Sequence, residues 1–279
     1  MLVVTTYYNP CRYKSRLNNY FNFRKNLEKN KIQLITIELA SKNEDFEIPD
    51  SVRFFGNAWL WQKESLISKA INIYSNEKIA WLDCDIIFEN NEWFKEVEEK
   101  LEDFDVLQLF EEVNFLNKTN KHSNLKFKST IFEYQNNPDF VKGHPNQGHP
   151  GFAWAAKRSF TNFYKKHFIF SGDVVFASSI IKNFWIINSW NISNILKKSI
   201  IEWCKSENCD ANCGYLKGKI NHLYHGSWKN RQYNSRLKLL QFYDKIKIKN
   251  GLFECEDEEI NSKFKYFYKK RNDDEKFFL

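Results

Sequence analysis

The stretch from Lys78 to Phe88 is KIAWLDCDIIF. Its uninterrupted apolar run, Ile79–Leu82, is typical of a strand covered on both faces in a parallel sheet. Asp83 and Asp85 then stand in otherwise apolar sequence, where unpaired carboxylates would be costly to bury. Ligands bind at the C-terminal strand ends of open α/β sheets, and a divalent cation there would satisfy both carboxylates. The stretch therefore predicts an Asp-X-Asp metal site, with aspartates that cap a helix or face solvent as the alternative.

Length and composition indicate a large, well-packed globular protein. The 279 residues can bury a full core, and we expect a main domain over residues 1–236 followed by a helical, basic extension over residues 237–279. Aromatic residues make up 17% of the chain, which argues against disorder. The net charge of +7 permits an anionic partner, but no nucleic-acid-binding module is recognisable, so we expect no nucleic-acid partner.

Apolar segments and cysteines indicate the compartment. No apolar run is long enough for a leader peptide or a membrane span, so we expect a cytoplasmic protein whose six cysteines are reduced. Cys204, Cys209 and Cys213 precede His222 and His225, which leaves a zinc cluster as an alternative, although the spacing lacks a C-x-x-C pair.

The first half of the chain predicts a β-α-β opening with a parallel sheet. Thr5, Thr6 and Tyr7 end the first predicted strand and would face the same crevice as Asp83, where they suit a nucleotide. Lys63 stands in the first turn of a predicted helix, where backbone N–H groups and a lysine together suit a phosphate; the alternative is a solvated lysine. The predicted elements are the strands 2–7, 32–39, 52–55, 79–82 and 105–110 and the helices 12–28, 59–74 and 91–101.

The second half of the chain contains three stretches of interest. Residues 115–140 have no clean period, and we interpret them as a long excursion over the active-site side. The loop 143–156, GHPNQGHPGFAWAA, contains His149 and Trp154 as candidates for acceptor contact, with Trp154 either a platform for a sugar ring or part of the core. Ser171 and Gly172 precede Asp173 at a predicted helix start, where an aspartate is either a cap or a functional acid.

The stretch 220–233, INHLYHGSWKNRQY, places two histidines before a basic loop. An imidazole there suits a metal ion, and Lys229 and Arg231 suit the oxygens of a diphosphate. Further on, Lys263–Arg271, KFKYFYKKR, interleaves aromatic and cationic residues. This composition suits either peripheral contact with an anionic membrane or a surface helix that packs its aromatic residues onto the body.

Taken together, these stretches resemble the GT-A-fold glycosyltransferases, which use nucleotide-diphosphate sugars. The resemblance covers residues 2 to about 236 and rests on the order of VVTTY, WQKE, WLDCDIIF with its D-x-D motif, GHPGFAWAAKR, SGD and HLYHGSWKNR. It implies an α/β fold of the Rossmann-like nucleotide-diphospho-sugar transferase type, with a mainly parallel central sheet flanked by helices. The inverting, galactosyltransferase-like branch carries a GGED-type motif whose acid is the base, whereas this chain has only SGD.

The resemblance also implies roles for the candidate residues. Asp85 with His225, rather than His222, would hold Mn²⁺ or Mg²⁺, and Asp83 would contact the ribose or the metal. Lys63, Lys229 and Arg231 would stabilise the departing diphosphate, and Asp173 would deprotonate an acceptor hydroxyl, which leads to inversion. The donor would be a UDP-sugar, the commonest in the family, and the acceptor a glycan or glycolipid.

Two other functions remain open from the sequence. A metal-dependent nucleotidyltransferase also uses spaced carboxylates, although VTTYYNP near the N-terminus is not the Gly-rich or basic phosphate loop that such enzymes usually need. A non-catalytic carbohydrate-binding protein of the same fold is the other alternative. A kinase or a Rossmann dehydrogenase is disfavoured, because neither a P-loop nor G-x-G-x-x-G occurs.

Overall fold

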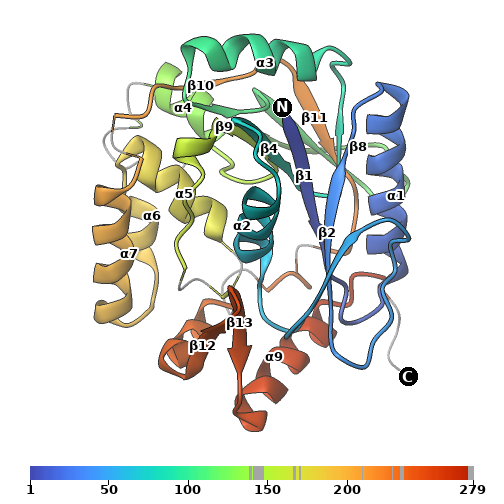
Figure 1. Cartoon of the computed structure of the whole chain (residues 1–279), viewed down its shortest axis with the longest axis vertical. Helices are drawn as coiled ribbons and strands as arrows, with labels where there is room; N and C mark the ends of the chain where they lie inside the picture. Colours follow the sequence, from blue (N-terminus) through green and yellow to red (C-terminus); the bar gives the residue numbers. More distant parts are fainter. Residues whose placement is uncertain are drawn as a thin grey trace.

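The central feature of the fold is a seven-stranded mixed sheet flanked by helices (Figure 1). The computed structural model describes residues 1–137, 140, 148–165, 168–169, 171–208, 210–227, 229–232 and 236–275. The strands of this sheet, in chain order, are β1 (Leu2–Tyr7), β2 (Ile35–Ala40), β3 (Val52–Phe55), β4 (Lys78–Leu82), β6 (Val106–Gln108), β9 (Ala153–Lys157) and β10 (Cys213–Tyr215).

The order of the strands explains where a crevice forms. In space the order is β10-β6-β9-β4-β1-β2-β3, and within this sheet β9 alone is antiparallel to its neighbours. The chain winds outward from β1 in both directions, through β2 and β3 on one side and β4 on the other. Such a switch point leaves a crevice outside the C-terminal strand ends. The prediction of a mainly parallel central sheet is therefore confirmed.

Helices cover both faces of this sheet, as its apolar strands predict. Val4 and Trp81 belong to one buried cluster, whereas Val3 and Ala80, their neighbours along the chain, belong to the other. Because side chains alternate between the faces of a strand, a strand covered on both sides is apolar throughout. The helices are α1 (Lys14–Lys29), α2 (Lys63–Ile73), α3 (Trp93–Asp103), α4 (Thr130–Asn136), α5 (Gly172–Ile181), α6 (Trp185–Ser189), α7 (Asn194–Ser206) and α9 (Glu258–Arg271), with 3₁₀ segments η2 (Arg158–Phe160) and η3 (Leu237–Lys245).

A second, four-stranded sheet brings a late strand next to the Asp-X-Asp stretch. It has the order β5-β11-β7-β8. Here β11 is antiparallel to β5, so that His222 pairs with Ile86. The strands are β5 (Ile86–Phe88), β7 (Glu112–Leu116), β8 (His122–Lys128) and β11 (Lys219–His222).

Residues 115–140, which we interpreted as a long excursion over the active-site side, contain regular secondary structure in their described part. This stretch contains β8, which pairs with β7 as an antiparallel hairpin, and α4, whose N-cap residue Ser129 accepts a hydrogen bond from the Phe132 N–H at 3.2 Å. Strand pairing and the cap decide this structure, because the residues themselves have no clean helical or strand period. Residues 138, 139 and 141–147, which include part of the predicted loop 143–156, lie outside the described residues.

The segment after residue 236 packs into the same core as the N-terminal strands. It consists of η3, the hairpin β12 (Ile246–Lys249) and β13 (Leu252–Cys255), and α9. Gln62, at the start of α2, exchanges two hydrogen bonds with the backbone of Phe253, at 2.7 and 2.9 Å. Phe264 and Leu2 lie in one hydrophobic cluster. The domain boundary at residue 236 stays a prediction.

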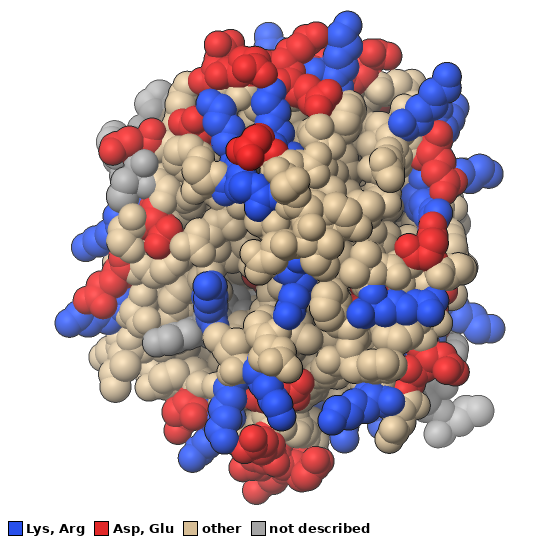
Figure 2. Space-filling view, in the orientation of Figure 1, with Lys and Arg blue, Asp and Glu red and all other residues tan. Residues whose placement is uncertain are grey.

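The basic and aromatic helix α9 turns its aromatic face inward. Phe264, Phe267 and Tyr268 are buried, whereas Tyr266 is 63% exposed. Of the two alternatives for this segment, the structure therefore has the helix that packs on the body. None of the described helices has the length and apolarity needed to cross a bilayer. On the face drawn in Figure 2, basic and acidic side chains are interspersed.

Candidate active site

A cavity of about 270 Å³ lies at the C-terminal ends of β1 and β4, where the strand order predicts a crevice. Thr6, near the end of β1, lines this cavity. Asp83, Cys84 and Asp85, which come directly after β4, line it as well. Asp173 reaches it from the first turn of α5. The cavity therefore collects residues from distant parts of the chain at the one edge that the topology leaves open.

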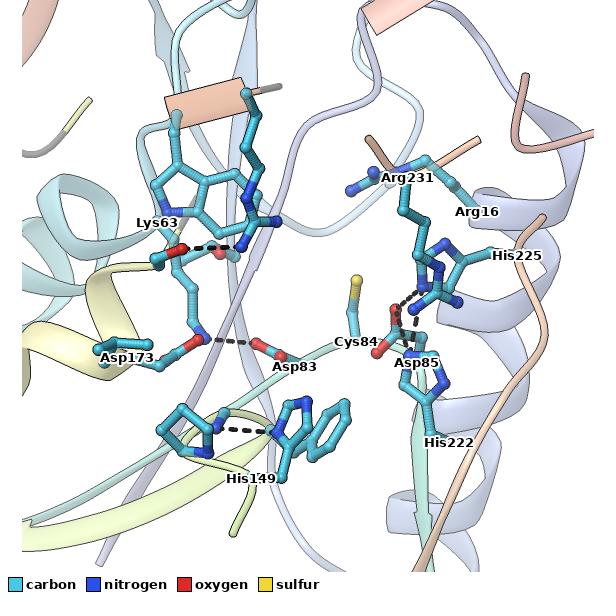
Figure 3. Close-up of a pocket in the computed structure, with 18 of the residues that line it drawn as sticks. Arg16, Lys63, Asp83, Cys84, Asp85, His149, Asp173, His222, His225 and Arg231 are labelled. Atoms are coloured by element: carbon cyan, nitrogen blue, oxygen red, sulfur yellow. Dashed lines mark hydrogen bonds and ion pairs between the residues drawn. The ribbon is translucent and has the colours of Figure 1, made fainter. Parts of the chain in front are cut away.

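The first feature of the cavity is a group of three possible metal ligands: Asp85, His222 and His225 (Figure 3). Their ligand atoms all lie within 4.8 Å of one another. Asp85 Oδ2 is 3.1 Å from His225 Nε2 and 3.8 Å from His222 Nε2, and the two Nε2 atoms are 3.3 Å apart. Asp85 Oδ1 is buried without a hydrogen-bond partner among the described residues. A cation would satisfy this oxygen, and so the residues fit a metal.

The protonation states of these residues also suit a metal. Burial lowers the pKa of His222 well below its ordinary value, and burial with the nearby Arg231 lowers that of His225. Burial alone would raise the pKa of Asp85, but His222, His225 and Arg16 hold it well below the usual range. Neutral imidazoles and an ionised carboxylate are the forms that bind metal. The sequence prediction chose His225 over His222; the structure brings both to Asp85.

A second layer of residues lies behind His225, whose Nδ1 makes no hydrogen bond within the described part of the chain. The carboxylate of Asp273 lies 3.8 Å from His225 Nδ1, on the side of the ring opposite to Asp85. Arg271 and Arg16 hold Asp273, at 3.2 and 3.6 Å. Carboxylates at this position commonly fix the tautomer of a metal-binding histidine. The extension after residue 236 thus contributes to the site.

The second feature of the cavity is a lysine between two carboxylates. Lys63, the first residue of α2, places its Nζ 2.6 Å from Asp83 Oδ1 and 2.9 Å from Asp173 Oδ1 (Figure 3). Its side chain is only 5% exposed. Burial alone would lower the pKa of Lys63, but Asp173, Asp83 and Glu64 raise it, so the ammonium stays charged. Lys63 is thus not a solvated lysine, and its contact with a phosphate stays a prediction. Asp83 faces this lysine and lies outside the group of Asp85, His222 and His225.

A further acid, Glu64, lies behind this ion-pair cluster. Burial and the nearby Asp173 raise its pKa to about 8, against the attraction of Lys63. A Cβ atom at Gly172 would lie 2.0 Å from Glu64 Oε1, so the absence of a side chain at Gly172 lets the carboxyl group approach the start of α5. The SGD stretch lacks the second acid of the GGED motif. In the structure, Glu64 of α2 places a carboxyl group next to Gly172 of this stretch.

His149 lines the cavity on the side of Asp173. An added Cβ at Gly151 would lie 3.1 Å from His149 Cε1 and 3.2 Å from Asp173 Oδ2, so both side chains lie close to this glycine. Burial lowers the pKa of His149 to about 3, and its ring stacks on Phe152 with centroids 4.1 Å apart. Phe152 has a φ of 79°, a strained conformation for this residue type. The neutral His149 is therefore held rigidly beside Asp173.

Four predicted site residues do not line the cavity. Trp154 is 1% exposed and donates its indole N–H to the carbonyl of Pro150, so it is a core residue and the interpretation as a sugar platform was wrong. Thr5 is also 1% exposed and bonds to the carbonyl of Leu82. The two remaining residues are Tyr7, which is buried and bonds to Glu47, and Lys229, which is exposed and absent from the cavity wall. In a strand covered on both sides, adjacent side chains point to opposite faces, and only Thr6 of the first predicted group lines the cavity.

Arg231, like Lys63, is a predicted cation that lines the cavity. It is 7% exposed and lies beside Asp85 and His225 (Figure 3). Sequence reasoning missed Arg16, Arg236, Arg271, Asp273 and Glu64. The sequence offers no motif for them, because each is a common surface residue type in a helix, a helix end or a loop.

Comparisons with known proteins find only distant likenesses to solved structures. No protein-family model matches this chain, and no curated protein matches its sequence. Similar solved structures include glucosyl-3-phosphoglycerate synthase from Mycobacterium tuberculosis with Mn²⁺, uridine diphosphate and phosphoglyceric acid, at 11% identity and a TM-score of 0.42, over 86% of this chain and 76% of that chain. A Drosophila β-1,4-galactosyltransferase 7 mutant with manganese, UDP-Gal and xylobiose matches at 10% identity and a TM-score of 0.38, over 76% of this chain and 82% of that chain.

The bifunctional IspDF from Campylobacter jejuni also matches, at 10% identity and a TM-score of 0.35, over 78% of this chain and 49% of that chain. Likenesses this low carry no argument about function. The mixed α/β fold with a large central sheet is evident from the strand order itself.

Proposed function

We infer that this chain is a metal-dependent glycosyltransferase that moves a sugar from a nucleotide-diphosphate sugar to a hydroxyl group of a glycan or glycolipid. One observation carries the proposal: the group Asp85, His222 and His225 shares a cavity with the cluster Lys63, Asp83 and Asp173 at the switch point of the sheet. A metal site beside a positioned carboxylate is what transfer from a diphosphate donor to a hydroxyl requires.

The proposed cofactor is a divalent cation, Mn²⁺ or Mg²⁺, held by Asp85, His222 and His225. Two imidazoles among the three ligands favour Mn²⁺, because Mg²⁺ prefers oxygen ligands. When bound, such a cation neutralises charge that develops on the departing nucleoside diphosphate. Arg231 lies on the same side of the cavity, where it adds positive charge near the diphosphate.

In the proposed reaction, Asp173 accepts the proton of the acceptor hydroxyl as this oxygen attacks the anomeric carbon. Lys63 holds the Asp173 carboxylate in position, and it holds Asp83 on the opposite side for contact with the donor, such as the ribose. Asp173 stands across the cavity from the metal group (Figure 3). This separation favours attack from the face opposite the leaving group, and hence inversion.

The test is the melting temperature with UDP, GDP, CMP and ADP, each with and without Mn²⁺. A ligand that binds the folded state raises the melting temperature by mass action. We expect a metal-dependent rise for one nucleotide, UDP first among them, and its loss in Asp85→Asn but not in Asp50→Asn. Asp50 is a suitable control because its carboxylate pairs with Arg24 on the surface and its side chain is 62% exposed.

Activity then separates glycosyl transfer from the two alternatives. The glycosyltransferase releases the nucleoside diphosphate from its sugar donor, and Asp173→Asn suppresses transfer while nucleotide binding persists. Binding of sugars without donor cleavage would instead identify a carbohydrate-binding protein. Release of pyrophosphate from a nucleoside triphosphate and a sugar phosphate would identify a nucleotidyltransferase.

A further inference from the structure

A second cavity shares part of its wall with the first one. It has a volume of about 420 Å³, and Ser171, Val174 and Arg236 line both cavities. Beyond these shared residues, its wall includes Trp190, Asn191 and Lys238. Since Ser171 stands two residues before Asp173, the shared wall lies next to the proposed base. A substrate that presents a hydroxyl to Asp173 can therefore extend into this second cavity.

The shared wall holds a fixed cation. Arg236 donates a hydrogen bond from Nη2 to Ser171 Oγ, at 2.7 Å. Ser171 itself has a φ of 103°, outside the range that serine ordinarily adopts, directly before α5 begins at Gly172. This bond ties the guanidinium to the start of α5, so that a positive charge is held close to Asp173.

The charges of the two cavities are distributed unevenly. The first cavity is lined by four arginines and Lys63, against the three carboxylates of Asp83, Asp85 and Asp173. Of the cations, Lys63 pairs with two of these acids, and Asp273 lies between two arginines. Among the described residues that line the second cavity, there are two cations, Arg236 and Lys238, and no carboxylate.

A donor does not account for the positive charge of the second cavity. The proposed diphosphate subsite lies at the metal group, where Figure 3 shows Arg231 and Arg16 beside Asp85, across the cavity from Asp173. A divalent cation and a diphosphate that carries about two negative charges would largely compensate each other there. Arg236 and Lys238 line the second cavity and therefore face whatever occupies it.

From this arrangement we propose that the acceptor carries an anionic group, a phosphate or a carboxylate, which Arg236 and Lys238 bind in the second cavity. This proposal rests on the glycosyltransferase function proposed above. The apolar wall formed by Val174, Ile186 and Trp190, with Asn191 beside it, suits the remaining body of a sugar or polyol. Guanidinium groups recognise phosphate and carboxylate oxygens through charge-assisted hydrogen bonds, which are stronger than neutral ones.

The experiment compares a matched series of acceptors: a neutral hexose, its 6-phosphate and the corresponding uronic acid. In the wild type, we expect both anionic members to be used, or to compete for the site, with an apparent affinity at least tenfold higher than the neutral member. Arg236→Gln and Lys238→Gln should each lower the ratio of anionic to neutral kcat/KM by tenfold or more. Lys245→Gln, a change in the same 3₁₀ segment at a side chain that is 58% exposed, should leave the ratio unchanged.

A ratio near one in the wild type, or an unchanged ratio in Arg236→Gln, would overturn the proposal. Melting with inorganic phosphate at constant ionic strength, with and without Mn²⁺ and UDP, separates this proposal from the proposed function. If no nucleotide binds, but phosphate raises the melting temperature of the wild type and not that of Arg236→Gln, then the proposed glycosyltransferase function is wrong and the proposed anion site is supported. If UDP binds with Mn²⁺ but phosphate gives no rise that depends on Arg236, then the anion site fails alone.

Discussion

Replacement of Lys63 by methionine tests whether the cluster of Lys63, Asp83 and Asp173 is a buried ion-pair network. Methionine has a similar length but carries no charge, so the variant leaves two carboxylates facing each other across the space that the ammonium occupied, 2.6 and 2.9 Å from their oxygens. Removal of one partner from a buried ion pair usually costs about 3–5 kcal/mol, because it leaves an uncompensated buried charge.

The magnitude should lie near the lower end of this range. The side chains of Asp83 and Asp173 are 28% and 21% exposed, so that water screens part of their repulsion. In a domain of this size, about 1 kcal/mol shifts the melting temperature by about 2–4 °C. With a cost of about 3 kcal/mol, we therefore expect Lys63→Met to melt about 6–12 °C below the wild type in metal-free buffer.

Two further variants make this result interpretable. Lys95→Met is the matched control, because the side chain of Lys95 is 74% exposed and its melting temperature should stay within about 1 °C of the wild type. The triple variant Lys63→Met, Asp83→Asn, Asp173→Asn removes all three charges and should recover most of the lost stability. The reasoning is refuted if Lys63→Met melts like the wild type, or if the triple variant is no more stable than the single one.

Three other predictions concern pH, the metal and the core. The pKa of Glu64 in the folded protein is raised to about 8 from an ordinary value of 4.5, so its contribution to stability is complete below about pH 4.5 and is lost as the pH rises towards 8. From pH 5 to pH 8, the melting temperature of Glu64→Gln should therefore decrease less than that of the wild type. An identical decrease in both proteins would contradict the pKa shift. His222→Asn and His225→Asn should each weaken Mn²⁺ binding, measured by titration calorimetry, and loss in only one of them would exclude the three-residue metal group. Trp154→Phe should lose about 1 kcal/mol with its hydrogen bond to Pro150, and Trp154→Ala about 3–5 kcal/mol, both measured by denaturant unfolding; if Trp154→Phe instead impairs acceptor binding at unchanged stability, then Trp154 is a substrate contact after all.

The central strand and the position of its acids could be predicted from the sequence. The apolar run Ile79–Leu82 predicts a buried strand from its own residues alone, because a strand covered on both faces needs apolar side chains at every position. A pair of carboxylates at the end of such a run is costly to bury without partners, and the structure brings Asp85 close to His222 and His225. The start of α5 just before Asp173 could also be predicted from neighbouring residues, since glycine and aspartate next to an apolar run indicate a helix N-terminus.

Other residues of the site are brought together by contacts between distant parts of the chain, which no pattern of neighbouring residues predicts. Asp273, Arg16 and Arg271 meet at His225 only because the end of α9 packs against α1, from opposite ends of the chain. Likewise, the direction of a side chain decided between alternatives that the sequence left open: Trp154 points into the core and Thr6 into the cavity.

Lys63 shows the same division most clearly. The sequence by itself determined that a lysine begins a helix near the crevice, because helix periodicity and strand composition are properties of neighbouring residues. Only the tertiary structure decided that its charge meets Asp83 and Asp173. A buried charge pairs with the opposite charges that tertiary packing brings close to it. The partners of Lys63 are Asp83 and Asp173, which lie 20 and 110 positions away from it in the chain.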